Sequence, residues 1–207
     1  MTTCKATISR KQAFIKRAFD FSLALVGLLF VWWLILLAWL LACWDMKSNG
    51  FFRQERVGLK GKRFTVVKIK TMRPLSSSQP VTTVTASDDP RISALGRFFR
   101  KTKIDELPQL WNVLLGQMSL VGPRPDVPGY LDTLEGEDRC ILKLRPGITG
   151  PATLKYRKEE EMLSFVEDPE KYNREVIFPD KVKINLEYMR NWSFKKDLYY
   201  IWKTIVG

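Results

Sequence analysis

The chain has 207 residues and a mass of 24.1 kDa, so it has room for one domain with at most a small appendage. Its formal net charge of +12 indicates an anionic partner, such as a membrane surface, a phosphorylated substrate or nucleic acid. The absence of histidine excludes Ser-His-Asp and Cys-His catalysis as well as histidine metal ligands. Any proton transfer or metal binding must therefore use carboxylates, Lys, Tyr or Cys.

The cysteines add no chemistry of their own. Cys4, Cys43 and Cys140 are far apart in the sequence and form no CxxC pair. We therefore expect neither a zinc site nor a disulfide framework, and we expect reduced thiols in a cytoplasmic setting.

The positive charge is concentrated at the N-terminal end of the chain. Residues 1–20 carry a net +4, residues 45–73 carry +7, and residues 74–207 carry only +1. The basic residues of the second stretch lack interleaved aromatics and any recognisable nucleic-acid module. A solvated or lipid-facing basic surface is therefore favoured over a nucleic-acid partner.

An apolar run lies between the two basic stretches. Residues 21–44 contain 24 consecutive residues without a charge, which is long enough for a helix to cross a hydrocarbon core of about 30 Å. The run is too long for the apolar part of a signal peptide, and Cys43-Trp44-Asp45 is a poor cleavage site. The sequence therefore predicts a retained membrane segment.

The topology of this segment has two alternatives. Because both flanks are basic, the positive-inside rule keeps both on the cytoplasmic side. Trp32 and Trp33 occupy the centre of the run, although Trp prefers the membrane interface. Both features fit a helix that enters one leaflet and returns, while an ordinary single-span anchor remains an equal alternative.

The rest of the chain alternates between periodic and turn-rich stretches. Residues 51–72 predict a short strand or hairpin on the membrane surface, and the Ser/Thr/Pro-rich residues 74–90 predict a linker. Helical apolar spacing marks Ile92–Lys103 and Pro108–Leu115. Val182–Val206 is an amphipathic stretch that either packs on the core or lies at the interface.

Asp105 and Glu106 are the first candidates for chemistry. They precede a helix with Pro108 in its first turn, so they lie near the positive end of its dipole. Carboxylates in such a place can hold Mg²⁺ against a diphosphate or attack phosphorus directly. Simple charge complementarity with the helix end is the alternative interpretation.

Two proline-containing motifs follow. In Gly122–Pro125, a Pro-Arg-Pro sequence presents one guanidinium with little loss of entropy when it binds a phosphate, or else pairs it with a surface acid. Arg145–Gly150 is a second Pro- and Gly-containing motif.

Residues 89–125, DPRISALGRFFRKTKIDELPQLWNVLLGQMSLVGPRP, resemble the signature region of the bacterial sugar transferase family. These are monotopic phosphoglycosyl transferases, which start glycoconjugate assembly on polyprenyl phosphate. The resemblance extends over nearly the whole chain, through KRAFD (16–20), FRQERVG (52–58), KIKTM (68–72), LRPGITGPA (144–152) and the tail at 188–204.

The resemblance implies a ping-pong reaction. Asp105 attacks the β-phosphorus of a UDP-sugar, UMP leaves, and polyprenyl phosphate then takes the sugar 1-phosphate from the enzyme. This chemistry suits a chain without histidine, because a carboxylate and a phosphate are both anionic nucleophiles near neutral pH. The product would be the first lipid-linked intermediate of an O-antigen, capsule, exopolysaccharide or glycoprotein glycan.

The resemblance also implies roles for particular residues. Asp105 and Glu106 would bind Mg²⁺, while Arg100 and Arg124 would hold phosphate oxygens. Further candidates for the same anionic pocket are Lys68, Arg56 and Arg145. The expected membrane-anchoring residues are Lys16, Arg17, Asp20, Trp32 and Trp33.

The chain departs from the family pattern in two places. Trp32-Trp33 stands where the family commonly breaks its membrane helix with Ser-Pro, so a bend must come from Gly27, from the flanking charges or from packing. Lys70 stands where the family usually has Arg, which keeps the charge but loses the bidentate fork.

We therefore predict an α/β, mainly helical fold. A basic segment with a re-entrant membrane helix (1–48) precedes a membrane-surface catalytic domain (49–207) that combines interfacial amphipathic helices with a small mixed globular part. We expect it on the cytoplasmic face of the bacterial inner membrane.

The expected partners are a UDP-sugar, undecaprenyl or another polyprenyl phosphate, and membrane lipids, without nucleic acid; a homodimer is left open. The alternative is a non-enzymatic protein that binds anionic lipids.

Overall fold

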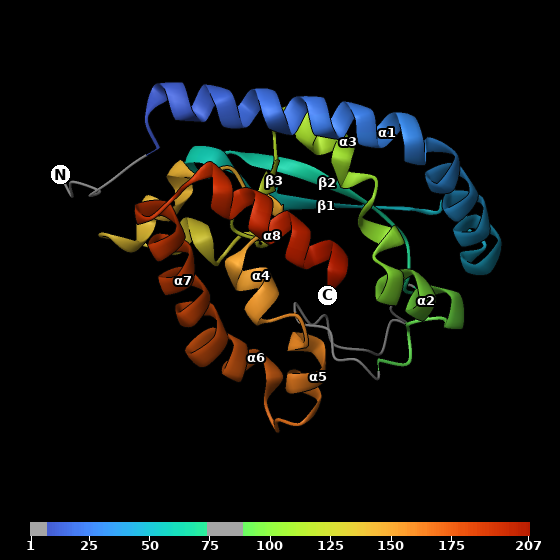
Figure 1. Ribbon diagram of the computed structural model, residues 1–207. Helices are drawn as coiled ribbons and strands as arrows, with labels where there is room; N and C mark the ends of the chain where they lie inside the picture. The colour runs from blue at the N-terminus through green and yellow to red at the C-terminus, as the bar shows by residue number, and fades with distance from the viewer. Residues whose placement is uncertain (1–7, 74–88) are drawn as a thin grey trace.

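The computed structural model describes residues 8–73 and 89–207, so most of the predicted linker lies outside the described residues. Within these ranges the chain is mainly helical, as expected, and it has two small two-stranded sheets (Figure 1). The strands are β1 (Phe51–Val57), β2 (Arg63–Ile69), β3 (Ser119–Val121) and β4 (Gly147–Thr149). The α-helices are α1 (Arg10–Met46), α2 (Ala94–Thr102), α3 (Gln109–Leu114), α4 (Pro151–Lys155), α5 (Glu159–Ser164), α6 (Pro169–Tyr172), α7 (Phe178–Arg190) and α8 (Phe194–Val206).

The predicted membrane segment, residues 21–44, forms the C-terminal two thirds of one longer helix, α1. Ser9 caps it reciprocally: its hydroxyl accepts from the Gln12 amide, and the Gln12 side chain accepts from the Ser9 amide. By length and composition α1 could cross a membrane, and most of its apolar stretch is exposed. In Figure 1, α1 runs along the top of the molecule and its C-terminal part curves down toward α2.

The N-terminal half of α1 is fixed to the globular part by buried polar contacts. The Lys16 ammonium donates to Asp197 of α8 over 2.6 Å. Asp20, which is 2% exposed, accepts from the Ser119 hydroxyl and from the Leu120 amide. Arg17 donates to the last carbonyl groups of α3. These contacts connect α1 to three separate parts of the domain.

The C-terminal half of α1 packs on the other end of the same domain. Ala38 and Ala42 are buried against Ile69 of β2 and Phe99 of α2. Just before α1 ends, Asp45 accepts a hydrogen bond from the hydroxyl of Ser93. Both ends of the apolar segment therefore contact one globular unit.

The predicted hairpin is confirmed. β1 and β2 pair antiparallel from Phe51 opposite Ile69 to Val57 opposite Arg63. The turn between them includes a short 3-10 segment, Leu59–Gly61, in which Gly61 has φ +75°, a conformation that glycine adopts without steric cost. The hairpin runs beneath α1 (Figure 1).

Helices α2 and α3 are also confirmed, and α3 has an unusual distribution of side chains. Its polar residues Gln109 and Asn112 are buried, whereas Trp111 is exposed and Leu115, just after the helix, is 57% exposed. The apolar residues that predicted this helix are therefore divided: Leu110 and Leu114 pack against the core, whereas Trp111 and Leu115 face outward. Helix α2 likewise leaves Phe98 exposed.

A parallel pair that sequence patterning did not predict joins the two proline-containing motifs. Ser119 of β3 lies opposite Gly147 of β4, and the Gly147 amide donates to the carbonyl of Pro123. A Cβ atom on Gly147 would lie 2.1 Å from the Gly122 nitrogen, so only glycine permits this backbone approach. The Gly-Pro-Arg-Pro loop is thus fixed directly after β3.

The C-terminal stretch forms two helices rather than one. Helix α7 ends at Arg190, and Ser193 caps α8 by accepting from the amide of Lys196. α8 buries Asp197 and exposes Trp202 and Ile205. The main core lies between α1, the hairpin, β3 and α7, and its residues include Val57, Val66, Val113, Met118, Val121, Ile141, Leu186 and Met189.

The expectation that all cysteines are reduced is wrong. Cys140, which is 3% exposed, is disulfide-bonded, whereas Cys43 is a free thiol. Sequence spacing does not reveal this, because cysteines far apart in the chain can meet in space.

Candidate active site

Asp105 and Glu106 lie in a single 3-10 turn, Ile104–Glu106, between α2 and α3. Lys103 ends α2 in the left-handed region at φ 59° and redirects the chain. As a result both carboxylates are buried, with exposed fractions of 7% for Asp105 and 8% for Glu106. A buried carboxylate needs hydrogen bonds or opposite charges nearby, so the surroundings of each carboxylate decide its protonation and reactivity.

Two cations balance the negative charge of Glu106. Its Oε1 accepts from the Lys68 ammonium at 3.0 Å and from the Arg124 guanidinium at 2.8 Å. Burial alone would raise its pKa, but Arg124 and Lys68 hold the pKa of Glu106 far below its usual range. In turn, Glu106 raises the pKa of Arg124. Glu106 is therefore a permanent anion that holds two cations in place.

Asp105 has the opposite environment. Its Oδ1 is buried and has no hydrogen-bond partner among residues 8–73 and 89–207. Burial, together with the adjacent negative charge of Glu106, raises the pKa of Asp105 to about 6. A carboxylate that is ionised near neutral pH but weakly solvated is a competent nucleophile or metal ligand.

The two cations come from separate elements. Lys68 lies on β2, which runs beside the Ile104–Glu106 turn, and burial lowers its pKa while Glu106 opposes that shift. Arg124 lies in the loop after β3, between two prolines that restrict its backbone. The hairpin and the β3–β4 pair thus converge on one carboxylate.

Two further charged residues adjoin Arg124. Arg56 of β1 donates to the carbonyl of Pro125, and burial, with the nearby charge of Arg124, lowers its pKa. Asp126 follows the Pro-Arg-Pro motif directly, and burial raises its pKa to about 6. Asp126 was not among the predicted residues, although its place beside Arg124 in the sequence could have indicated it.

Arg100 lies at the edge of the site. It is close enough to Asp105 to lower the pKa of that carboxyl, and its Nε donates to the hydroxyl of Thr71. Its Nη1 contacts both carboxylate oxygens of Glu160 at 3.1 Å. A phosphate that binds Nη1 of Arg100 must therefore displace the carboxylate of Glu160, which lies on α5.

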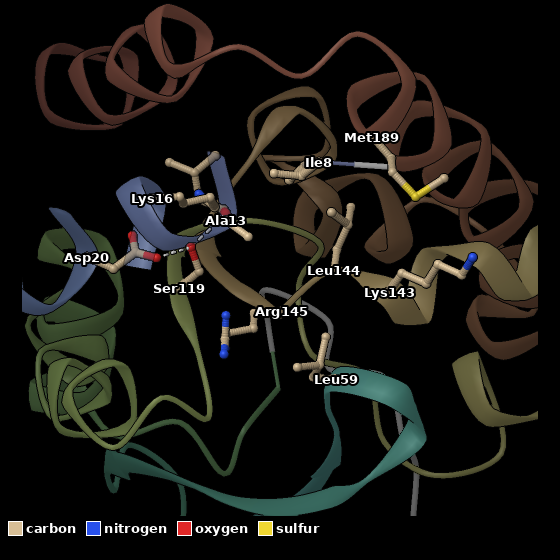
Figure 2. Close-up of a pocket in the computed structure, with 11 residues that line it drawn as sticks. Ile8, Ala13, Lys16, Asp20, Leu59, Ser119, Lys143, Leu144, Arg145 and Met189 are labelled. Atoms are coloured by element: carbon tan, nitrogen blue, oxygen red, sulfur yellow. Dashed lines mark hydrogen bonds between the residues drawn. The ribbon is translucent and has the colours of Figure 1, made fainter. Parts of the chain in front are cut away.

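Arg145 is not part of this cluster. Its Nε donates to the carbonyl of Gly116, and the side chain lines a pocket of about 140 Å³ beneath the first turns of α1. Figure 2 shows this pocket with Lys16, Asp20 and Ser119 on one side and Arg145 below them. Neither Asp105 nor Glu106 lines it.

The expected anchoring residues fall into two groups. Lys16, Arg17 and Asp20 make the contacts with the globular part described above. By contrast, Trp32 and Trp33 are 60% and 56% exposed. The three polar residues face the protein, and the two tryptophans face outward.

The arrangement of the carboxylates shows whether the site could bind a metal ion. Within the part of the chain that the structure describes, no group of three or more Asp, Glu or Cys residues could hold a metal ion. The unpartnered Asp105 Oδ1 nevertheless fits a cation that is bound through one or two carboxylates, with water and substrate phosphates as its other ligands. This is the usual environment of Mg²⁺, so the residues present fit that ion.

The geometry describes a membrane-associated helical protein in which a buried, unpartnered carboxylate lies next to an anchored anion and several cations. A model of the family described as bacterial sugar transferase matches residues 11–207. The chain therefore belongs to the bacterial sugar transferase family.

Three relatives show the range of similar proteins. A UDP-galactose-lipid carrier transferase of Erwinia amylovora is 32% identical over 93% of this chain and 40% of its own length. A UDP-glucose:undecaprenyl-phosphate glucose-1-phosphate transferase of Escherichia coli is 34% identical over 96% and 41%. The exopolysaccharide production protein ExoY of Sinorhizobium fredii is 31% identical over 92% and 83%. The chain thus spans about 40% of the length of the first two relatives.

Proposed function

We propose that this protein transfers a sugar 1-phosphate from a UDP-sugar to undecaprenyl or another polyprenyl phosphate and releases UMP. Family membership supports the reaction class, and the names of two relatives include UDP-galactose and UDP-glucose. The single observation that carries the proposal is the buried Asp105 carboxylate, which lies next to Glu106 and its two cations and has an unpartnered oxygen.

The reaction proceeds in two displacements at one phosphorus atom. A carboxylate oxygen of Asp105 attacks the β-phosphorus, the bond from that phosphorus to the bridging oxygen breaks, and UMP leaves with the electron pair. An oxygen of polyprenyl phosphate then attacks the same phosphorus and breaks the bond to Asp105. The carboxylate is regenerated, and no general base is needed because both nucleophiles are already anions.

The surrounding residues stabilise charge. Arg124 and Lys68, held by Glu106, provide positive charge beside the transferred phosphoryl group, and Arg100 binds phosphate after exchange with Glu160. Arg56 contributes more distant positive charge. Mg²⁺, held by Asp105 with support from Glu106, would neutralise the diphosphate of the donor.

The protein acts at a membrane surface on the cytoplasmic side, where a soluble nucleotide sugar and a lipid phosphate can meet. The contacts of α1 support a re-entrant helix, because Asp20 and Asp45, which flank its apolar segment, both bond to one domain. A straight spanning helix would carry these ends to opposite sides of a hydrocarbon core of about 30 Å.

The chemistry is tested by UMP release. The purified full-length chain in nanodiscs is incubated with Mg²⁺ and radiolabelled UDP-glucose, UDP-galactose or UDP-N-acetylgalactosamine, with and without undecaprenyl phosphate. Without acceptor, we expect one UMP per enzyme and a labelled protein. Asp105→Asn should give neither UMP nor a labelled protein, while it should still associate with vesicles of anionic lipid.

Full turnover by this variant contradicts the nucleophile assignment. A wild-type protein that binds lipid but releases no UMP favours the lipid-binding alternative.

The topology is tested separately. A cysteine introduced at Lys11, an exposed residue in the first turn of α1, is labelled with a membrane-impermeant maleimide. The re-entrant arrangement predicts labelling from the cytoplasmic side alone. Labelling from the opposite side of intact cells would instead establish a spanning helix.

A further inference from the structure

Two amide side chains lie on the buried face of α3, and their environments differ. Asn112 is 2% exposed and is fully engaged: its Nδ2 donates to the Thr65 carbonyl and to Gln117, and its Oδ1 accepts from the Val67 amide. Asn112 thus fixes α3 to the edge of β2. Its role is to hold the structure together.

Gln109, one turn earlier on the same face, is 3% exposed, so it has almost no access to water. Its Nε2 is buried and has no hydrogen-bond partner in the described ranges 8–73 and 89–207. A buried amide donor without a partner loses its hydration and gains nothing in return, so such groups are rare in proteins and point to a bound water, an ion or a catalytic role.

The position of Gln109 relative to Asp105 indicates which of these applies. The two residues are four apart, and the backbone between them stays in the right-handed helical region through Leu107 and Pro108. The 3-10 turn Ile104–Glu106 continues into α3, so the two side chains lie about one turn apart along one helical backbone. Asp105 Oδ1 is itself buried and unpartnered. A buried free donor and a buried free acceptor therefore lie about one helical turn apart.

We propose that Gln109 is a further catalytic residue, whose Nε2 donates a hydrogen bond to a phosphoryl oxygen of the sugar phosphate carried by Asp105. This inference rests on the proposed function, because it takes Asp105 as the nucleophile. A neutral amide donor suits this position: it stabilises charge on the phosphoryl oxygen without competing with Arg124 or Lys68 for Glu106. The donor is left unpaired in the free protein because its acceptor arrives with the substrate.

The test uses Gln109→Met, which keeps the length of the side chain and removes the donor. We expect the single-turnover rate of UMP release to fall about 10- to 100-fold, with little change in KM, because the bond matters most as charge develops in the transition state. We also expect the melting temperature without substrate to stay the same or rise, because an unpaired buried polar group has been replaced by an apolar one.

Asn112→Leu is the matched control on the same helix face. It should lower the melting temperature by several degrees, because it leaves two backbone groups of β2 without partners. A merely structural Gln109 would follow this pattern. A fall in the melting temperature of Gln109→Met comparable to that of Asn112→Leu would therefore overturn the proposal, as would UMP release within twofold of wild type.

The failure of this proposal and the failure of the proposed function can be distinguished. If wild type releases UMP, Asp105→Asn does not, and Gln109→Met releases it within twofold of the wild-type rate, the role of Gln109 is contradicted while the nucleophile stands. If wild type releases no UMP from any donor, both proposals are contradicted.

Discussion

Buried carboxylates occur in two regions of the protein, at the junction of α1 with the domain and at the start of α3. At the junction, Asp197 accepts from Lys16, from the Tyr188 hydroxyl and from the Trp192 indole. At the start of α3, Asp105 has a buried oxygen with no partner in the part of the chain that the structure describes. The two aspartates are similarly buried and differ in how completely their oxygens are hydrogen-bonded.

The difference separates structural from functional polar residues. Satisfied buried carboxylates such as Asp20 and Asp197 hold elements together, because each donor they bind would otherwise be unpaired. The unsatisfied Asp105 adds no such contact and raises the free energy of the folded state when it is ionised. No hydrogen bond to Oδ1 offsets that cost in the part of the chain that the structure describes.

The largest expected effect on stability is at the junction. Asp197→Ala leaves the Lys16 ammonium, which is 12% exposed, and two aromatic donors without an acceptor. Loss of one partner of a buried ion pair costs about 3–5 kcal/mol. Chemical unfolding in detergent measures this, with Asp138→Ala at an exposed aspartate as a control. A loss below about 1 kcal/mol would contradict the structural role assigned to this cluster.

The second prediction concerns the stability of Asp105→Asn and its dependence on pH. Because the pKa of Asp105 is raised to about 6 in the folded protein, this carboxyl favours the folded state below its unfolded pKa and loses that contribution as the pH rises through 6. The variant should therefore match wild type near pH 4 and be more stable by about 2–3 kcal/mol above pH 7.

Unfolding curves of Asp105→Asn and wild type at pH 4, 5, 6 and 7.5 measure this difference. The Asp180→Asn variant should show no such gain at high pH, because hydrogen bonds from Lys155 and Tyr156 lower the pKa of Asp180 in the folded protein. If Asp105→Asn is less stable than wild type at pH 7.5, the ionised Asp105 carboxylate is stabilised in the folded protein, and the prediction is wrong.

The smallest expected effect is at the edge of the site. Glu160 is half-exposed, and its contact with Arg100 must be exchanged for substrate phosphate. Glu160→Gln should lower KM for the UDP-sugar about two- to fivefold and leave kcat unchanged, in proportion to the modest strength of an exposed ion pair. Initial-rate kinetics measure this. Glu161→Gln, which breaks an exposed pair with Lys158, should change neither constant.

Much of the fold could be predicted from the sequence because it depends on local patterns. The uncharged residues 21–44 specify an apolar helix wherever they lie, and the turn around Gly61 specifies the hairpin. The parallel β3–β4 pair could not be predicted, since its three-residue strands are too short for a period and lie 28 residues apart. The burial of Gln109 and Asn112 on α3 could not be predicted either, because apolar spacing does not show which polar side chains of a helix are enclosed by other elements.

The candidate site was predicted in part. The motifs identified Asp105, Glu106 and Arg124, and the structure brings these together with Lys68. Arg145 is held elsewhere by the Gly116 carbonyl. Gln109, to which we assign a catalytic role, was not among the predicted residues, although it follows Asp105 by only four positions.

The sequence by itself determined that the protein has a basic, membrane-directed N-terminal end, that histidine takes no part in its chemistry, and which charged motifs are available. These properties follow from composition and local spacing, which do not depend on the fold. Only the tertiary structure decided which cations contact Glu106, which oxygen of Asp105 is left unpaired and that α1 is fixed to the domain at both ends. Those outcomes depend on which residues, distant in sequence, pack together and exclude water. Loss of water around each group then sets its charge and reactivity.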